Sequence, residues 1–300
     1  MLSTPVIFII YNRPDLTERV FAQIRRVQPT HLYVIADGPR PDREHDAELC
    51  HATRDQIRVD WPCELHLDYS DRNLGCQQRI HSGLSRAFER YDRAIILEDD
   101  CLPALSFFTF CEAMLDRYAN DEAVMHINGS NFVEPQRFKY SYGFTQYSTP
   151  WGWATWRRAW SHMDLQMKQF LEDPDFYKKQ LKISRRAFTK LIRRLEKVRS
   201  KTVDSWAYPW LAANIAANGR ALTPKQNLIS NIGFDARSTH TNNSNSFFAN
   251  RDTGEFNVEQ SSHPISIEID RQLNREVFGI FFGGKYRKKW SWRKWMKRRK

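Results

Sequence analysis

The sequence is poor in the residues on which several common enzyme classes depend. Glycine supplies only 12 of the 300 residues, and there is no G-x-G-x-x-G, P-loop, H-E-x-x-H or G-x-S-x-G pattern. The five cysteines are an odd number and include no C-x-x-C pair, which indicates neither a disulfide framework nor a zinc knuckle. These absences argue against ordinary dehydrogenases, P-loop NTPases and serine hydrolases.

Long apolar segments are also absent. The first apolar run, residues 6–11, is far shorter than the roughly 20 residues that span a bilayer, and no basic segment precedes it. We therefore expect a soluble protein without a secretory signal, working in a reducing cytoplasm. With 41% hydrophobic and 13% aromatic residues, the chain can bury a sizeable core, which excludes wholesale disorder.

The formal charge of +11 is concentrated in two segments. The last sixteen residues, 285–300, contain ten Lys and Arg and no acid, and residues 178–201 contain eleven basic residues and one acid, Glu196. The remainder has 25 basic and 34 acidic residues. The sequence therefore predicts an acidic body that carries two basic segments.

The first hundred residues alternate between short β-rich apolar runs and amphipathic stretches, a pattern typical of parallel strands with covering helices. We predict strands at 6–11, 32–36, 65–69 and 94–97, with Asp42 capping a helix that runs into the mid-fifties. Pro103 suits the first position of the next helix. Further along we predict a strand at 123–128, helices at 178–201 and 204–219, a strand at 227–233 and a flexible loop at 239–251.

Polar residues follow each of the first four predicted strands. Because right-handed crossovers bring the carboxyl ends of parallel strands to one edge of the sheet, a ligand crevice is expected there. We find no internal repeat and no linker that divides the chain. The predicted fold is α/β, with a mostly parallel sheet flanked by helices, in a single domain with a basic C-terminal extension.

Three carboxylates, Glu98, Asp99 and Asp100, leave the fourth strand together. Such clustering is unfavourable unless a cation or hydrogen-bond donors compensate it, and hard oxygen ligands favour Mg²⁺ or Mn²⁺. The alternative is an acidic turn that simply caps the following helix.

The ordered set of motifs resembles inverting nucleotide-sugar glycosyltransferases of the GT-A fold, especially the N-acetylglucosaminyltransferase I type and its bacterial relatives. The resemblance covers roughly residues 5–245. Its carriers are Tyr11-Asn12-Arg13-Pro14, Asp37-Gly38, Arg72-Asn73-Leu74-Gly75, Leu97-Glu98-Asp99-Asp100, Pro150-Trp151-Gly152-Trp153, Asp204-Ser205-Trp206, and Asn231-Ile232-Gly233 with His240.

The resemblance implies a role for each group of residues at the donor site. Asp100 would bind a divalent metal, Mn²⁺ or Mg²⁺, Asp99 would contact the ribose or the metal shell, and Glu98 would contact the donor sugar. Tyr11 and Asp37 would hold the nucleoside, and Arg13 and Arg79 are candidates for the diphosphate. Asn12, Arg72 and Asn73 complete the nucleotide-sugar set. Asp37-Gly38-Pro39 could instead be a plain turn.

An inverting transferase also needs a general base for the acceptor hydroxyl. The resemblance points to Asp204, although Asp204 could simply cap the following helix. His240 is a candidate near the metal, and Trp151, Gly152 and Trp153 are candidates for the sugar and acceptor site. Trp is more often a core residue, and a lone His is usually not a ligand.

The resemblance also suggests a division of the chain. Residues 1–265 would form the glycosyltransferase domain, with a nucleotide-sugar half at 1–130 and an acceptor half at 131–265, and 266–300 would form an amphipathic, basic extension. The segment 285–300 interleaves Trp290, Trp292 and Trp295 with cations, which is typical of an anionic membrane surface. A solvated tail is the alternative, and nucleic acid is disfavoured because the body is acidic.

The sequence thus predicts a metal-dependent glycosyltransferase that is cytoplasmic and peripheral at the inner face of the membrane. It would move a sugar from a nucleotide-diphosphate sugar to a glycan or glycolipid acceptor, such as a lipopolysaccharide or capsule precursor. The alternatives are a nucleotidyltransferase of nucleotide-sugar synthesis and a non-catalytic protein that binds glycans or membranes.

Overall fold

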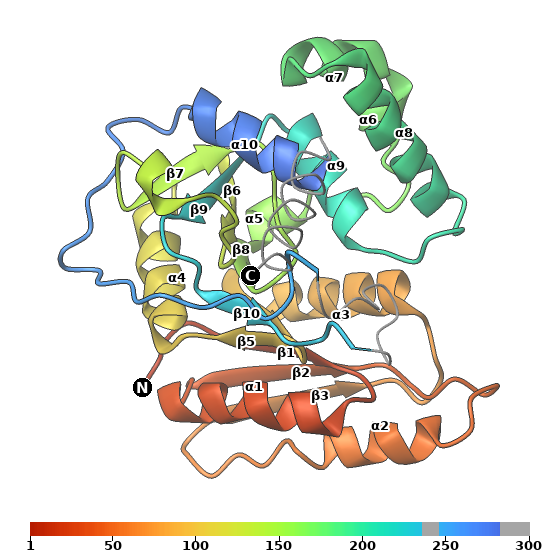
Figure 1. The fold of residues 1–300 in the computed structure, drawn as a ribbon. Helices are drawn as coiled ribbons and strands as arrows, with labels where there is room; N and C mark the ends of the chain where they lie inside the picture. The colour runs from red at the N-terminus through yellow and green to blue at the C-terminus, as the bar shows by residue number, and fades with distance from the viewer. Residues whose placement is uncertain (236–245, 283–300) are drawn as a thin grey trace, which may run out of the picture.

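The computed structural model describes residues 1–235 and 246–282, and an eight-stranded sheet forms the centre of this part of the chain (Figure 1). The strand order is β3-β2-β1-β4-β8-β6-β9-β7. The strands are β1 (Val6–Ile10), β2 (His31–Ala36), β3 (Glu64–Tyr69), β4 (Arg93–Glu98), β6 (Val124–Asn128), β7 (Tyr142–Thr145), β8 (Trp153–Trp156) and β9 (Arg220–Pro224).

The first four strands are parallel neighbours, as the alternating pattern predicts. The strand β8 lies antiparallel between β4 and β6, and β7 closes the far edge antiparallel to β9. Because β6 and β9 run in the same direction as the first four strands, most of the sheet is parallel. The predicted α/β fold, a mostly parallel sheet flanked by helices, is confirmed.

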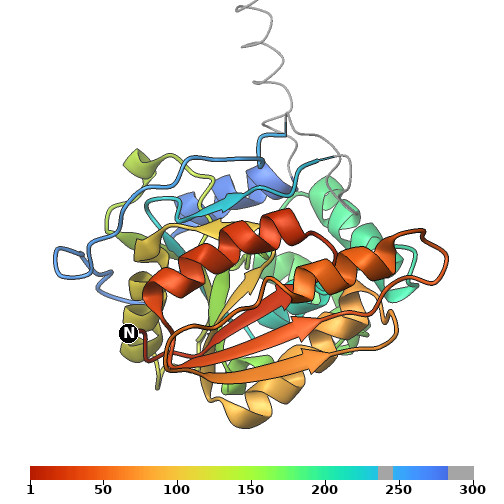
Figure 2. The ribbon, with the colours of Figure 1, turned by 90° about the horizontal axis from the view of Figure 1, so that it is seen from below.

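Both faces of the parallel strands are covered by helices (Figure 2). Along β1, Val6, Phe8 and Ile10 point into a cluster with α1 (Pro14–Val27), whereas Ile7 and Ile9 point into a second cluster with α3 (Cys76–Arg90). This double burial explains why β1 is continuously apolar rather than alternating. The helix α2 (Asp46–Arg54) packs beside α1. Asp42 precedes α2 without capping it, because the N-cap position is His45.

A short two-stranded sheet adjoins the end of β4. It consists of β5 (Cys101–Pro103) and β10 (Ile229–Asn231), paired antiparallel. Pro103 therefore ends a strand and does not begin the next helix, which is α4 (Leu105–Arg117) with Ala104 at its N-cap. Of the strand predicted at 227–233, only the centre forms a strand, β10, and the residues on either side are irregular.

The second half of the chain builds its own hydrophobic cluster from helices. The helices of this cluster are α6 (Lys168–Glu172), α7 (Pro174–Leu181), α8 (Arg185–Arg199), α9 (Ala207–Ala216) and α10 (Arg271–Phe281). The short helix α5 (Arg157–Trp160) packs instead into the cluster with α3, and a 3-10 turn covers Pro135–Arg137. The helix predicted at 178–201 is two helices, because Lys182 adopts a left-handed conformation and Ser184 caps α8. The helix predicted from 204 begins only at Ala207.

The described part of the predicted extension, residues 266–282, contains the helix α10. This helix packs on β7, and Leu273, Val277 and Ile280 are buried with Phe132 and Tyr147. The apolar face of α10 is therefore occupied by the body, and residues 283–300 lie outside the described part. Among residues 1–235 and 246–282, no helix is long and apolar enough to cross a bilayer.

Candidate active site

The acidic triplet lies where β4 ends, beside the end of β1. Ile9 pairs with Glu98 in the sheet, and the backbone N–H of Tyr11 donates to Asp99 Oδ2 at 3.1 Å. The guanidinium of Arg13 reaches Asp100, with 3.4 Å between Nη1 and Oδ2. The structure thus brings together Tyr11, Arg13 and the three carboxylates at the carboxyl edge, where the topology predicts a crevice.

The three carboxylates hold more negative charge than their surroundings neutralise. Burial, then repulsion from Asp100 and Asp99, raises the pKa of Glu98 well above its usual range, although a hydrogen bond from the Trp206 side chain opposes the shift. Burial and repulsion from Asp100 raise the pKa of Asp99 to about 7. Burial also raises the pKa of Asp100, although Arg13 opposes the shift. In the described part of the chain Arg13 is the cation that pairs with this group, and one positive charge does not balance three carboxylates, so a further cation would stabilise them.

The donor set fits a hard divalent cation that keeps much of its own hydration. Among residues 1–235 and 246–282, no three His, Cys, Asp or Glu side chains gather in a metal-ligand arrangement. Mg²⁺ and Mn²⁺ are commonly held by one or two carboxylates together with waters and substrate phosphates. Asp99 and Asp100 are partly exposed and supply that number of carboxylates.

The segment after β10 wraps around Asp100. The backbone N–H of Ile232 donates to the Asp100 carbonyl at 2.8 Å, and the amide of Asn231 lies 3.5 Å from Asp100 Oδ1. Gly233 touches Asp100 and Arg13 so closely that a Cβ atom would collide with the carboxylate. The Asn231-Ile232-Gly233 motif therefore shapes the Asp100 side of the site.

Asp37 organises the loop that follows β3. Its two oxygens accept hydrogen bonds from the backbone N–H groups of Gly38, Leu74 and Gly75 and from the Asn73 amide, at 2.9 to 3.2 Å. Asp37 is buried, 7% exposed. Its acceptor capacity is used within the chain, which leaves little of it for the base of a nucleotide.

A buried carboxylate that no sequence motif indicates, Asp46, joins the loops that follow β1 and β2 at this edge. Asp46, at the start of α2 and 2% exposed, accepts from the Tyr11 hydroxyl at 2.7 Å and the Asn12 amide at 2.6 Å. Arg40 binds the same carboxylate, with 2.9 Å between Nη2 and Oδ1, and its guanidinium lies over the Tyr11 ring. Although burial opposes it, these donors lower the pKa of Asp46. Asn73 donates to the Tyr11 hydroxyl at 3.1 Å.

No sequence signal separates Asp46 from its neighbours. Acids are ordinary in the first turn of a helix, and Glu44 and Glu48 flank it. Only the three-dimensional arrangement shows that Asp46 is buried and surrounded by donors.

Asp204 caps a helix other than the one that follows it. Its Oδ2 accepts from the N–H of Cys76 at 2.7 Å and its Oδ1 from the N–H of Gln77 at 2.8 Å, so it caps α3 from 128 residues away. Gly75, with φ of +80°, leaves room for this carboxylate. Asp204 remains exposed to solvent. Two residues further along, the Trp206 side chain hydrogen-bonds to Glu98, which brings the Asp204 segment beside the triplet.

Arg79 and Arg72, the two other arginines predicted to bind the nucleotide sugar, do not contact the triplet. Arg79 is 2% exposed, and its guanidinium donates to the Ala36 carbonyl and to Asp68. It ties the ends of β2 and β3 together and does not face a diphosphate. Arg72 is exposed on the loop after β3.

The residues of the predicted aromatic motif, Trp151, Gly152 and Trp153, lie in different surroundings. Trp153 is fully buried and stacks between His126 and Trp206, with ring centroids 5.1 and 5.2 Å away. Our expectation that Trp153 lines a sugar site does not hold, because no surface of it is exposed. Trp151 is partly exposed and packs with Phe132, Phe234, Phe248 and Phe281. Gly152 has φ of +58° and is buried against Ile229. His240 lies outside the described residues.

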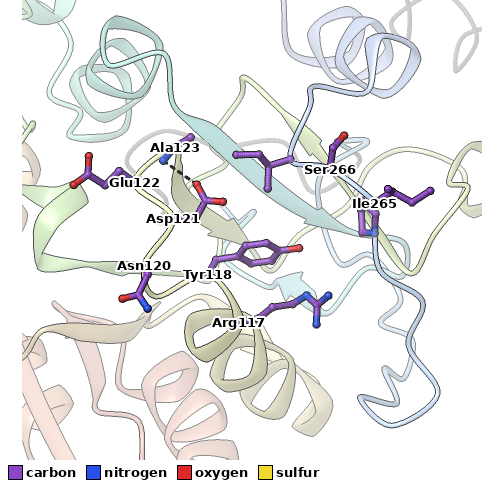
Figure 3. Close-up of a pocket in the computed structure, with 10 residues that line it drawn as sticks. Arg117, Tyr118, Asn120, Asp121, Glu122, Ala123, Ile265 and Ser266 are labelled. Carbon is purple, nitrogen blue, oxygen red and sulfur yellow. Dashed lines mark hydrogen bonds between the residues drawn. The ribbon is translucent and has the colours of Figure 1, made fainter.

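A separate cavity of about 820 Å³ opens at the other end of α4 (Figure 3). It is lined by Arg117, Tyr118, residues 120–123 and residues 264–267. With a rise of about 1.5 Å per residue, the 13 residues of α4 place it on the order of 20 Å from the triplet. None of the predicted site residues lines it.

No protein-family model matches the chain, and a search of curated proteins finds no match. Among solved structures, a mannosyltransferase from Pyrobaculum calidifontis in complex with GDP-Man and Mn²⁺ is similar. The identity is 14% over 73% of this chain and 70% of that chain, with a TM-score of 0.37.

Two nucleotidyltransferase structures are similar at the same level. A UDP-glucose pyrophosphorylase complexed with UDP-glucose is 6% identical over 74% of this chain and 90% of its own, with a TM-score of 0.36. A protein from Bacillus anthracis described as a glucose-1-phosphate thymidylyltransferase, in complex with a sucrose, is 10% identical over 72% and 96%, with a TM-score of 0.32. At these scores the likenesses assign no activity to this chain.

Proposed function

We propose that this chain is a metal-dependent glycosyltransferase of the GT-A type that moves a sugar from a nucleoside-diphosphate sugar to a glycan, with inversion. One observation carries the proposal: three carboxylates gather at the carboxyl edge of the parallel strands, and among residues 1–235 and 246–282 the cation that pairs with them is Arg13. Ligands of open α/β sheets bind at this edge, and the excess negative charge suits a divalent cation.

The Asp99 and Asp100 carboxylates would hold Mn²⁺ or Mg²⁺. When bound, such an ion stabilises the negative charge that develops on the departing nucleoside diphosphate. Arg13, next to Asp100, adds a fixed positive charge on the same side, which supports a diphosphate position between them. Asn231 and Gly233 hold the Asp100 side chain in place.

The nucleoside would lie against the loops that Asp46 joins. The Tyr11 ring, with Arg40 over one face, is held by hydrogen bonds to its hydroxyl from Asn73 and to Asp46, so its orientation is set before a ligand binds. Preorganisation of this kind lowers the entropy lost on binding. In this proposal Asp37 shapes the loop at 73–75, and Glu98 faces the donor sugar.

Asp204 is the proposed general base. It is exposed, it lies near the triplet, and each of its oxygens has a second lone pair beyond the bond to α3. A base at this point would remove the proton of the acceptor hydroxyl as that oxygen forms its bond to the anomeric carbon and the diphosphate leaves. Trp151 is proposed for the acceptor side, and His240 for the metal side.

A nucleotidyltransferase is disfavoured by the connection after β1. Such an enzyme would normally carry a glycine-rich phosphate loop there. In this chain only Tyr11, Asn12 and Arg13 separate the end of β1 at Ile10 from Pro14, the first residue of α1. This connection has no glycine and no room for a phosphate-binding loop.

We place the protein in the cytoplasm, at the inner face of the membrane, with a lipid-borne glycan as acceptor. The support is the Trp-rich basic segment 285–300. Co-sedimentation of the full chain and of a chain ending at Gly284 with anionic vesicles tests this segment. Equal binding by the two chains would remove it from the proposal.

The activity test compares two reactions in parallel. The chain is incubated with nucleotide sugars and Mn²⁺, and release of nucleoside diphosphate is measured; in the second reaction, nucleoside triphosphates and sugar 1-phosphates are supplied and pyrophosphate is measured. We expect release of nucleoside diphosphate but not of pyrophosphate, and we expect a chelator or the substitution Asp100→Ala to abolish it. Glu18→Gln, an exposed acid on α1, is the matched control. Pyrophosphate release, or full activity in Asp100→Ala, would overturn the proposal.

A further inference from the structure

A dense row of cations lies on α8, the helix that ends shortly before Asp204. Arg186, Lys190, Arg193, Arg194 and Lys197 occupy positions i, i+4, i+7, i+8 and i+11, which fall on one face of a helix, and all five are exposed. We call these five residues the basic face. The opposite face packs into the body through Ala187, Phe188, Leu191, Leu195 and Val198.

The basic face has no acidic partner in the described part of the chain. None of its five cations forms an ion pair with an acid of residues 1–235 or 246–282, and Arg194 lies instead over the Tyr208 ring at 5.4 Å. Like charges one turn apart destabilise a helix. The row therefore works against the stability of α8 and suits an external anionic partner.

The neighbouring helix adds an exposed aromatic side chain. Phe176, on α7, is 56% exposed, and the same helix carries Lys178 and Lys179. Figure 1 shows α6, α7 and α8 grouped at one edge of the molecule, beyond α9, so this edge is free of the sheet. Cations and an exposed aromatic ring at one edge of the molecule suit the headgroup region of an anionic bilayer, where aromatic rings insert and positive charges meet lipid phosphates.

We propose that the basic face of α8 is a docking surface for an anionic lipid membrane. This surface is separate from the reaction chemistry and does not depend on it. A membrane is favoured over nucleic acid because the chain outside the two basic segments, 178–201 and 285–300, is acidic and would repel a long phosphate backbone, whereas a flat bilayer need only meet this one edge. Four residues join α8 to Asp204, so docking here would hold the candidate site close to the bilayer.

Vesicle flotation with the full chain tests the surface. The vesicles contain phosphatidylcholine alone or mixed with phosphatidylglycerol. We expect the full chain to bind only the mixed vesicles, and more weakly as salt rises. The charge-reversal variant Arg186→Glu/Lys190→Glu/Lys197→Glu should bind them at least about tenfold more weakly, since each cation near an anionic surface contributes severalfold in affinity.

A matched variant separates position from net charge. Arg19→Glu/Arg26→Glu/Arg43→Glu makes the same charge change on exposed residues of α1 and of the loop before α2, across the sheet from α8. It should bind within about twofold of the unchanged chain if the position of the cations matters more than their number. Equal losses in the two triple variants would overturn the proposal.

Two further measurements cover the remaining outcomes. The neutral variant Arg186→Gln/Lys190→Gln/Lys197→Gln preserves helix-forming residues, and an intermediate loss with an unchanged melting temperature would support docking through charge. Unchanged binding in both α8 variants would overturn it. Tighter binding of an oligonucleotide than of vesicles, lost in the α8 variants, would overturn it in favour of a nucleic-acid surface.

Discussion

Replacing Asp204 tests whether this residue has one role or two. The carboxylate accepts hydrogen bonds from the N–H groups of Cys76 and Gln77, the first turn of α3. Loss of an N-cap lowers the free energy of unfolding by about 1 kcal/mol, and loss of a negative charge at a helix N-terminus by roughly 0.5 kcal/mol more. We therefore expect Asp204→Ala to lower it by about 1.5 kcal/mol. Asp204→Asn keeps one acceptor oxygen and should lower it by about half as much.

The assay pairs a melting temperature with a turnover number. For a chain of this size the Asp204→Ala change corresponds to roughly 2–4 °C in melting temperature. If Asp204 is also the general base, the Asn variant should lose about 10²- to 10⁴-fold in kcat at a temperature where it is folded, with unchanged donor affinity. If Asp204 only caps α3, kcat should change by no more than severalfold.

Gly75→Ala is the matched control, because it disturbs the cap and keeps the carboxylate. A Cβ atom at position 75 would lie 2.8 Å from Asp204 Oδ2, in a backbone conformation with φ of +80°. This variant should melt lower and keep a base at position 204. An unchanged melting temperature in Asp204→Ala would refute the capping role.

Three further predictions concern other parts of the site and core. Gly233→Ala should weaken Mn²⁺ binding, measured by calorimetry, at least about tenfold, because the new methyl group displaces the Asp100 carboxylate. The melting temperature should change little. An unchanged Mn²⁺ affinity would contradict the contact between Gly233 and Asp100. Asp46→Ala should lower the free energy of unfolding by about 2–3 kcal/mol in urea titrations, because it removes a buried acceptor of several donors. Tyr11→Phe removes a hydroxyl with two hydrogen bonds, one to Asp46 and one from Asn73, but leaves the other donors on Asp46, so it should lower the free energy of unfolding by only about 1 kcal/mol. Equal values would argue against Asp46 as the residue that holds these loops together. Burial lowers the pKa of His126 to about 3 in the folded chain. As the pH drops below roughly 6.5, this histidine is protonated in the unfolded chain but not in the folded one. The free energy of unfolding should therefore fall by up to about 1.4 kcal/mol per pH unit. His126→Gln should flatten that slope in urea titrations at several pH values, and an unchanged slope would show that other groups cause it.

The sequence predicts the first half of the fold well for a physical reason. Parallel strands buried on both faces read as continuous apolar runs, and amphipathic helices repeat every three to four residues, so each element carries its own signal. The antiparallel strands β7 and β8 carry no such signal. They are four residues each, in an aromatic segment where Trp153 serves the core and Trp151 lies nearer the surface.

The sequence also predicts which strand ends meet, and hence the grouping of Tyr11 and Arg13 with the triplet. It does not predict which polar side chains at that edge are used internally. Asp37 and Arg79 stand at positions where the resemblance predicts ligand contacts. In the structure, their side chains form hydrogen bonds with other residues of the chain instead. The buried Asp46 carboxylate accepts from donors in two separate loops, Tyr11 and Asn12 after β1 and Arg40 after β2, and no local pattern encodes such an arrangement.

The position of β8 has a consequence for how the chain is made. The strand β6, at residues 124–128, pairs in the described part of the chain with β8 and β9, which are synthesised about 30 and 95 residues later. Until β8 inserts, β4 presents an open edge with unpaired backbone groups, which is where nascent chains misassociate. The first four strands and the later strands therefore complete one sheet late in synthesis, and pausing or truncation near residue 150 should expose an aggregation-prone intermediate.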